Sequence, residues 1–152
     1  MPKANEEKLD LAPVLKNVVD LYSSPDVEIK LSNNFDRTVS VFVDRDLIIR
    51  VFNNLIKNAI QAVEEDQKTI IHIDCEVSKN HYVLSFKDNG KGIPEETRKK
   101  IFTPNFTTKT TGSGLGLAMV KQIITNHNGE IWFETEIGKG TIFYVKLPVF
   151  EE

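Results

Sequence analysis

The sequence contains almost no cysteine and no long apolar run. Its 152 residues include a single cysteine, Cys75, which excludes an internal disulfide framework and a cysteine-based zinc site and favours a reducing compartment. No apolar run approaches the ~20 residues that a membrane-spanning helix needs, and the polar, acidic start MPKANEEKLD is unlike a signal peptide. We therefore expect a cytoplasmic domain that makes no direct membrane contact.

The chain also lacks an excess of charge of either sign. Nineteen Lys and Arg side chains stand against 22 Asp and Glu, a formal net charge of −3, which is no electrostatic footprint for nucleic acid or an anionic membrane. No internal repeat or low-complexity stretch occurs. The 40% hydrophobic and 27% charged residues are typical of one globular domain, at a length close to the usual ~150 residues.

Hydrophobic periodicity predicts the secondary structure. Helices are expected over residues 10–22, 46–64 and 115–127, and strands over 27–31, 39–43, 69–77, 81–87, 131–137 and 141–147. Asp44 is the expected N-cap of the second helix. Residues 1–8 are expected to be a flexible remnant of a linker, and residues 9–150 to form the domain.

The order of these elements predicts the fold class. Strands arrive in hairpin-like pairs separated by helices, which favours an α+β fold: a two-layer α/β sandwich with a mixed sheet and helices on one face. Residues 88–116 show little hydrophobic pattern, and such a long irregular segment inside a compact domain is usually functional.

The second predicted helix carries a stripe of side-chain amides. Asn54, Asn58 and Gln61 follow one another at spacings of four and three residues, so they share one face of the helix. One interpretation is a solvated polar face. The other is a set of amide oxygens offered to a hard cation such as Mg²⁺, with a substrate phosphate supplying the remaining negative charge.

Glycines gather at two places in the irregular segment. Residues 88–93 form either a simple turn or a site where Asp88 accepts from an exocyclic amine while the glycines let a planar ring approach the backbone. Residues 112–117 open a helix, where bare N–H groups and the helix dipole favour a phosphate. They match neither the dinucleotide-binding fingerprint nor the Walker A pattern. Residues 98–113, with Lys109, are expected to act as a lid that orders when nucleotide binds.

Taken together and in this order, these segments resemble the catalytic and ATP-binding domain of bacterial sensor histidine kinases. Residues 54–59 resemble the N box, 88–92 the G1 box, 102–109 the F box and the start of the ATP lid, 112–117 the G2 box, and 138–141 the last glycine motif. The resemblance covers about residues 9–148. It implies the Bergerat (GHKL) fold shared with DNA gyrase, with ATP and Mg²⁺ as cofactors.

The resemblance also implies a role for each matching residue. Asn58 would ligate Mg²⁺, Asn54 would lie beside the metal and the phosphates, and Lys109 would reach the phosphates, which makes these three the expected catalytic residues. At the other end, Asp88 would take the adenine amino group, Gly90, Gly92 and Ile93 would shape the adenine pocket, and Thr141 would lie beneath the base. The remaining nucleotide-binding candidates are Gln61, Phe106, Thr108, Gly112, Ser113, Gly114, Leu115, Gly116 and Leu117.

The residue type at position 54 separates two functions. The resemblance implies that ATPases of the same superfamily carry a Glu at the position of Asn54, where it activates a water as a general base. An amide takes no proton from water, whereas a neutral histidine needs no strong base to act as a nucleophile. We therefore expect transfer of the γ-phosphoryl group of ATP to a histidine. The alternative is a nucleotide-binding module, or a weak ATPase of the same fold, without kinase activity.

The phosphoacceptor is expected to lie outside this chain. His72, His81 and His127 lack the helical context in which the family places its acceptor. The resemblance implies two partners, the dimerisation and phosphoacceptor domain of the same kinase and a response regulator downstream. Without the dimerisation domain, we expect the isolated chain to be monomeric. Full-length kinases of this family can be membrane-anchored.

Overall fold

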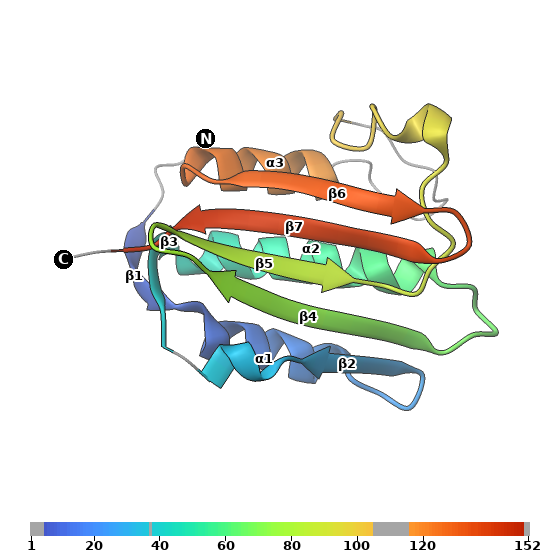
Figure 1. The fold of residues 1–152 in the computed structure, drawn as a ribbon, viewed down its shortest axis with the longest axis horizontal. Coiled ribbons are helices and arrows are strands. Elements are labelled where there is room, and N and C mark those ends of the chain that lie inside the picture. Colours follow the sequence, from blue (N-terminus) through green and yellow to red (C-terminus); the bar gives the residue numbers. More distant parts are fainter. Residues whose placement is uncertain (1–4, 37, 105–115, 151–152) are drawn as a thin grey trace.

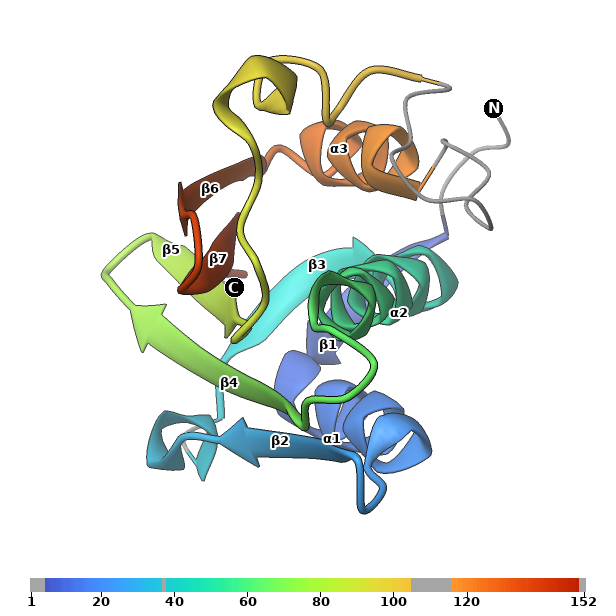
Figure 2. The same ribbon diagram turned by 90° about the vertical axis from the view of Figure 1, so that its right-hand side faces the viewer.

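The computed structural model describes residues 5–36, 38–104 and 116–150. Along the chain these residues form β1 (Glu6–Asp10), α1 (Leu11–Tyr22), β2 (Val27–Leu31), the 3₁₀ turn η1 (Asn33–Asp36), β3 (Ser40–Asp44), α2 (Arg45–Ala62), β4 (Thr69–Val77), β5 (His81–Lys87), the 3₁₀ turn η2 (Glu95–Thr97), α3 (Gly116–Asn126), β6 (Glu130–Glu136) and β7 (Gly140–Pro148). Helices α1, α2 and α3 cover one face of a sheet, and no described α-helix covers the other (Figures 1 and 2). The predicted two-layer α+β sandwich is confirmed. None of the described helices is both long and apolar enough to cross a bilayer.

The main sheet has five strands in the order β2-β4-β5-β7-β6. β2 runs parallel to β4, while the other three neighbouring pairs are antiparallel, so the sheet is mixed, as predicted. β1 and β3 form a separate antiparallel ribbon near the end of the sheet where β7 finishes (Figure 1). An isolated bridge from Val41 to Val149 connects this ribbon with the chain just after β7.

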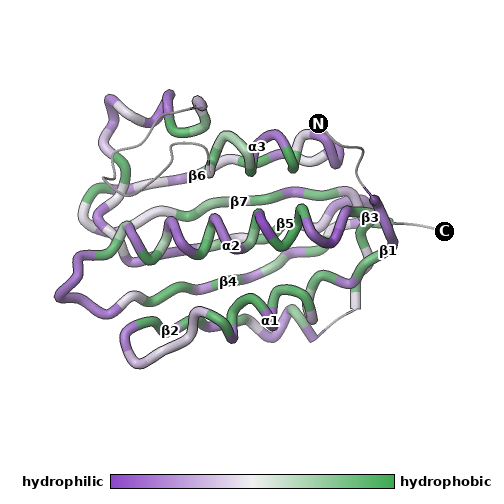
Figure 3. Tube along the Cα trace, turned by 180° about the vertical axis from the view of Figure 1, so that it is seen from behind, coloured by the Kyte–Doolittle hydropathy of each residue, from purple (hydrophilic) through white to green (hydrophobic). Residues whose placement is uncertain are grey.

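The core lies between the sheet and the helices. Along β5, Tyr82, Leu84 and Phe86 face the helices and are at most 2% exposed, as the alternation of a strand requires. Hydrophobic and hydrophilic residues alternate along α2 in Figure 3, whose buried residues are Ile48, Val51, Phe52, Leu55, Ile56 and Ala59. The rings of Phe52 and Phe86 join the two layers, with 6.1 Å between their centroids. This packing holds α2 in one rotation about its axis and so decides where its amide stripe lies.

The helix ends follow from local capping. Asp44 Oδ1 accepts from the N–H of Leu47 at 3.1 Å, which confirms the predicted N-cap of α2. The N–H of Asn5 donates to Asp44 Oδ2 at 2.7 Å. These backbone donors, Asn5 foremost, lower the pKa of the Asp44 carboxyl. At the end of α3 the backbone turns at Asn128, which has φ 64°, a conformation that Asn tolerates better than most residues.

The structure differs at residues 6–8 from the flexible linker remnant that is expected over residues 1–8. These residues belong to β1, where Glu6 pairs with Asp44 and Lys8 with Phe42. The segment is polar, and Leu9 is its one buried hydrophobic residue, so it carries no alternating pattern that would indicate a strand. Its order comes from backbone pairing with β3, a partner that lies far along the chain.

Candidate functional site

Asp88 lies just after the end of β5, beside the start of β7. It is 4% exposed. Its Oδ1 atom accepts from the N–H of Gly90 at 2.8 Å and from the N–H of Thr141 at 3.1 Å. The N–H of Asp88 in turn donates to the carbonyl oxygen of Thr141 at 2.9 Å. The carboxylate is therefore buried and held in one orientation, an arrangement suited to receiving a hydrogen bond from a ligand.

Two glycines allow the chain around Asp88 to pack this closely. Gly140 has φ +129°, and a Cβ on it would lie 2.2 Å from the Asp88 carbonyl oxygen. A Cβ on Gly90 would lie 2.6 Å from the carbonyl oxygen of Ala62, at the end of α2. Since neither position has room for a side chain, the backbone on both sides of Asp88 lies directly against β7 and α2.

The loop after Asp88 is fastened to the turn between β6 and β7. The N–H of Gly138 donates to the carbonyl oxygen of Lys91 at 2.9 Å. Gly92 has φ +83°, and a Cβ on it would lie 2.6 Å from the carbonyl oxygen of Glu136. The loop and the turn therefore form one wall, at the end of the sheet where β5 finishes and β7 begins (Figure 1).

The half-buried Ile93 is held on both sides of its backbone. Its N–H donates to Thr135 Oγ1 at 2.9 Å, and its carbonyl oxygen accepts from Arg98 Nε at 3.0 Å. Thr135 Oγ1 also lies 2.9 Å from Oγ1 of Thr141, which is 3% exposed. Neither Thr135 nor Arg98 is among the site residues that the sequence predicts. The one available signal for Thr135 is a hydroxyl at an inward-facing position of an alternating strand.

Asn54, the first residue of the amide stripe of α2, faces the start of α3. Asn54 and Asn58 are half-buried and Gln61 is exposed. Asn54 Nδ2 donates to the carbonyl oxygen of Arg50 at 2.8 Å, and a Cβ on Gly116 would lie 2.6 Å from Asn54 Oδ1. The structure thus brings Asn54 together with the first residue of α3. The next residue, Leu117, packs against the hydrophobic core.

The donor set at this stripe fits a magnesium–phosphate pair. Asn54 and Asn58 offer amide oxygens, which are hard ligands that suit Mg²⁺. These amides are neutral, so the charge of a divalent cation would be balanced by the phosphates of a ligand. The orientation of Asn54 Oδ1 towards Gly116 agrees with this, because a helix start is where anions are favoured.

Part of the predicted site lies outside the described residues. These candidates are Phe106, Thr108, Lys109, Gly112, Ser113, Gly114 and Leu115, and with them residues 105–113 of the predicted lid. Before residue 105, Phe102 lies 6.1 Å from Phe133 and 6.4 Å from Phe143 between ring centroids. The Nζ atom of Lys121 lies 5.4 Å from the centroid of the Phe102 ring. Phe102 therefore anchors this part of the chain to the sheet and to α3.

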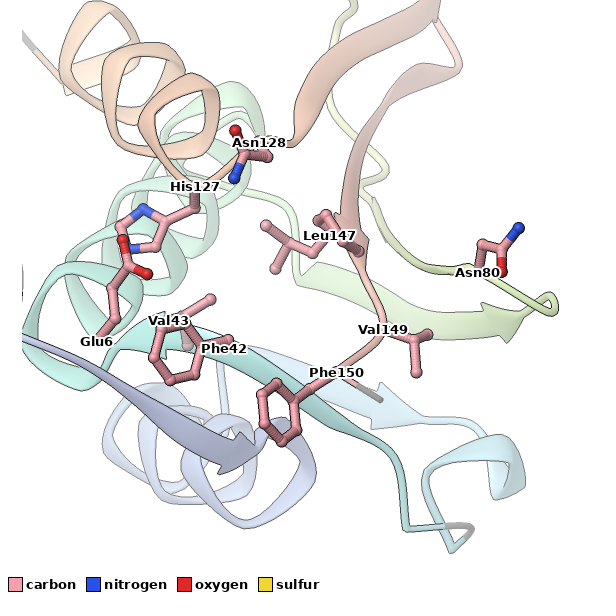
Figure 4. Close-up of a pocket in the computed structure, with 10 residues that line it drawn as sticks. Glu6, Phe42, Val43, Asn80, His127, Asn128, Leu147, Val149 and Phe150 are labelled. Carbon is pink, nitrogen blue, oxygen red and sulfur yellow. The ribbon is translucent and has the colours of Figure 1, made fainter. Parts of the chain in front are cut away.

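A separate hollow of ≈ 370 Å³ lies at the opposite end of the sheet. Its lining residues are Glu6, Phe42, Val43, Asn80, His127, Asn128, Leu147, Pro148, Val149 and Phe150 (Figure 4). His127 Nε2 accepts from the N–H of Asp44 at 3.1 Å, and Nδ1 lies 2.7 Å from the carbonyl oxygen of Ile123. Both ring nitrogens thus join structural elements. Among the residues that the structure describes, no predicted site residue lines this hollow.

Comparison with known proteins identifies similar sequences and folds. A family model described as histidine kinase-, DNA gyrase B-, and HSP90-like ATPase matches residues 43–151. Sporulation kinase C of Bacillus subtilis (strain 168) is 36% identical over 143 residues, which cover 91% of this chain and 33% of that protein. Sensor histidine kinase ZraS of Escherichia coli (strain K12) is 35% identical over 147 residues, covering 94% and 31%. The chain therefore spans about a third of the length of these relatives.

A solved structure agrees with the sequence matches. The catalytic domain of histidine kinase ThkA is similar with a TM-score of 0.82 and 33% sequence identity, covering 95% of each chain. The likeness therefore extends over nearly all of both chains.

Proposed function

The chain belongs to the family of histidine kinase-, DNA gyrase B-, and HSP90-like ATPases, as a catalytic ATPase domain of the kind found in sensor histidine kinases, and we propose that it binds Mg-ATP and transfers the γ-phosphoryl group to a histidine. The acceptor histidine lies on a dimerisation and phosphoacceptor domain outside this chain. A response regulator receives the phosphoryl group in the next step of two-component signalling. The observation that carries this proposal is Asn54, an amide that faces the first residue of α3.

The end of the site around Asp88 binds the adenine base. An ionised carboxylate only accepts hydrogen bonds, and Asp88 is held in place by the N–H groups of Gly90 and Thr141. Adenine donates from its amino group, whereas guanine presents a carbonyl oxygen at the same position. A buried carboxylate that faces the guanine carbonyl oxygen gains no hydrogen bond from the base, which disfavours guanine. This end of the site therefore selects ATP over GTP.

The end of the site along α2 binds the phosphates. Asn58 and Asn54 would hold Mg²⁺, and the cation would supply positive charge beside the phosphates. Backbone N–H groups at the start of α3 would donate hydrogen bonds to phosphate oxygens. Lys109, which lies outside the described residues, would supply a positive charge. The chain positions the phosphates and stabilises charge, and phosphoryl transfer requires little else from a protein.

Asn54 favours phosphoryl transfer over hydrolysis. Its Nδ2 group donates to the Arg50 carbonyl oxygen, and its Oδ1 is a neutral amide oxygen that takes no proton from water at neutral pH. Hydrolysis by a general base requires a group that accepts this proton. A neutral imidazole brings its own nucleophilic lone pair, so the histidine of an acceptor domain needs no base at position 54.

An assay with a separate acceptor tests this proposal. The chain is mixed with a histidine-bearing helical hairpin of the family and with ATP radiolabelled on its γ-phosphate. We expect label on the hairpin that is labile in acid and stable in alkali, as expected of phosphohistidine. A hairpin with Ala in place of the acceptor histidine should stay unlabelled, and so should the intact hairpin mixed with the Asn58→Ala chain.

A neighbouring asparagine provides the matched control. Asn53 lies on the same helix, but its Oδ1 accepts from the Tyr22 hydroxyl of α1 at 2.6 Å, away from the start of α3. Asn53→Ala should therefore preserve labelling of the hairpin. Release of inorganic phosphate without labelling would indicate a weak ATPase instead, and ATP binding without turnover would indicate a binding module. Either result would overturn the proposal of kinase activity.

A further inference from the structure

The ring of His127 joins the end of α3 to the start of α2. His127 directly follows α3 and is 4% exposed. Its Nδ1 atom lies 2.7 Å from the carbonyl oxygen of Ile123, one turn earlier in α3. Its Nε2 atom accepts from the N–H of Asp44 at 3.1 Å, and Asp44 is the N-cap of α2. The ring is therefore held by one helix and reaches the cap of the other.

The protonation state of this ring follows from its two partners. A backbone N–H can only donate, so the Nε2 atom that faces the Asp44 N–H must offer a lone pair. A neutral imidazole then carries its proton on Nδ1, where the carbonyl oxygen of Ile123 accepts it. The contact with Asp44 thus requires the neutral ring. A proton added to Nε2 would face the Asp44 N–H and break this hydrogen bond.

A second contact lies further along the same pair of helices. Gly116, the first residue of α3, lies against α2, since a Cβ on it would be 2.6 Å from Asn54 Oδ1. Ten residues separate Asp44 from Asn54 and eleven separate Gly116 from His127, which is about 15 Å and about 17 Å at the helical rise per residue. The two segments therefore run antiparallel over a matched length, with one contact at each end.

The register of α3 along α2 depends on these end contacts. The buried residues of α3 are Val120, Ile123 and Ile124, and apolar packing of this kind is not directional. A hydrogen bond restricts both distance and angle. Loss of the bond from Asp44 to His127 would allow α3 to shift on α2.

We propose that His127 is a positioning residue that, while its ring is neutral, sets the register of α3 on α2 and so the position of the phosphate-binding start of α3 relative to Asn54. This inference rests on the proposed function, because it assumes that phosphates bind at the start of α3. Histidine is the side chain that ordinarily gains a proton between about pH 5 and pH 8. Affinity for Mg-ATP should therefore be highest above this range and fall as His127 is protonated.

Two carboxylates lie near the ring and bear on its protonation. Glu6 of β1 is exposed and lines the same hollow as His127 (Figure 4). The Asp44 carboxylate already accepts from the N–H groups of Asn5 and Leu47. The lining residues from β3, from β7 and from the turn before β5 are not titratable. The protonated ring is attracted by Glu6 and repelled by the Asp44 N–H, so it should turn from α2 towards β1.

Two substitutions separate the hydrogen bond from the packing of the ring. His127→Gln offers an amide oxygen at a similar reach to Nε2 and does not titrate, whereas His127→Phe fills the space of the ring and accepts no hydrogen bond. The dissociation constant of Mg-ATP is measured between about pH 5 and pH 8 by competition with a fluorescent ATP analogue. The nucleotide's own protonation is the same for every chain, so it cancels when the chains are compared.

We expect the three chains to differ in their pH profiles. At the top of the range, His127→Gln should bind Mg-ATP as the wild type does, and His127→Phe about fivefold more weakly. At the bottom of the range, the wild type should bind about fivefold more weakly than His127→Gln. His72 is exposed on β4 and provides the matched control, since His72→Gln should keep the wild-type profile.

The outcomes separate this inference from the function on which it rests. If the wild type and His127→Gln share one pH profile, the titration of His127 does not reach the phosphate site and the inference is overturned. If His127→Gln and His127→Phe weaken binding equally at the top of the range, the ring only fills space and the inference is also overturned. If His127→Phe does not fold, the comparison of the wild type with His127→Gln still decides. If the wild type binds no Mg-ATP at any pH, the proposed function itself is wrong and the inference falls with it.

Discussion

Substitution of Gly140 by alanine measures how closely β7 must approach Asp88. Gly140 combines φ +129° with a Cβ position that would lie 2.2 Å from the Asp88 carbonyl oxygen. Gly138, in the same turn, has φ +84°, and a Cβ there would meet nothing within 4 Å. The two alanine variants therefore share a strained backbone conformation, and only Gly140→Ala adds a steric clash beside the base-binding end.

The cost of each substitution follows from this difference. A non-glycine residue at positive φ costs about 1–3 kcal/mol, which is the whole expectation for Gly138→Ala. Real Cβ contacts essentially never fall below 3.0 Å, so Gly140→Ala must increase the separation between the new Cβ and the Asp88 carbonyl oxygen by at least 0.8 Å, the difference between 3.0 and 2.2 Å. A shift of that size breaks the two hydrogen bonds between Asp88 and Thr141, each contributing about 0.5–1.5 kcal/mol. Gly140→Ala should therefore cost about 2–6 kcal/mol.

Urea unfolding of the two variants provides the measurement. The free energy of unfolding in water and the slope with urea are compared with those of the wild type, and an unchanged slope shows that the loss is one of stability. We expect Gly140→Ala to lose about 1–3 kcal/mol more than Gly138→Ala, the contribution of the two broken bonds. Equal losses in the two variants would refute the argument, because they would show that the approach of β7 to Asp88 relaxes without cost.

Three other predictions concern the metal, the start of α3 and the response to pH. Asn58→Ala should weaken Mg-ATP binding at least tenfold (~1.4 kcal/mol) while the fold stays intact, and an unchanged Mg-ATP titration would contradict the ligand assignment. Gly116→Ala places a Cβ 2.6 Å from Asn54 Oδ1, so it should displace that amide and also weaken Mg-ATP binding, while equal affinity would show that the amide orientation is unimportant. The lowered pKa of Asp44 means that its charge stabilises the fold above the unfolded value of about 3.9 and that this contribution is lost as the pH falls through the folded value. Asp44→Asn should therefore destabilise the chain at neutral pH and progressively less below about pH 4, and a pH-independent difference in urea unfolding would refute this.

Local patterns predict most of the fold because they act within each element. The alternation of residues 69–77 and 81–87 gives the bounds of β4 and β5 that the structure shows, and Asp44 caps α2 as expected. The ribbon of β1 and β3 could not be predicted, since residues 6–8 are polar and depend on backbone pairing with a distant strand. The order of the five strands is likewise decided by packing between elements, which no single segment encodes.

The glycines around Asp88 show how far the sequence predicts the site. It predicts that those at 90 and 92 let a planar ligand ring approach the backbone, whereas in the structure a Cβ at 90, 92 or 140 would meet protein backbone. Thr135 could not be found in this way, because an inward-facing hydroxyl in an alternating strand has the same appearance whether it joins the core or a site. At position 89 the sequence indicates only part of the turn predicted over residues 88–93. The Asn89 side chain instead accepts from the N–H of Ile70 and donates to the carbonyl oxygen of Lys68, which ties the loop to the start of β4.

The pairing of β5 with β7 has a consequence for how the protein folds. β4 pairs with β5, and β6 with β7, across short turns, so each hairpin can form from local contacts. The two hairpins meet only where β5 pairs with β7, and there Asp88 and Thr141 are 53 residues apart in the sequence. Closing so long a loop costs entropy before its contacts contribute, so the surroundings of Asp88 assemble late in folding. A nucleotide that needs Asp88 and Thr141 together binds the native state and not the separate hairpins. A nucleotide added to an unfolding experiment should therefore lower the unfolding rate. The same nucleotide added during refolding should leave the early steps unchanged.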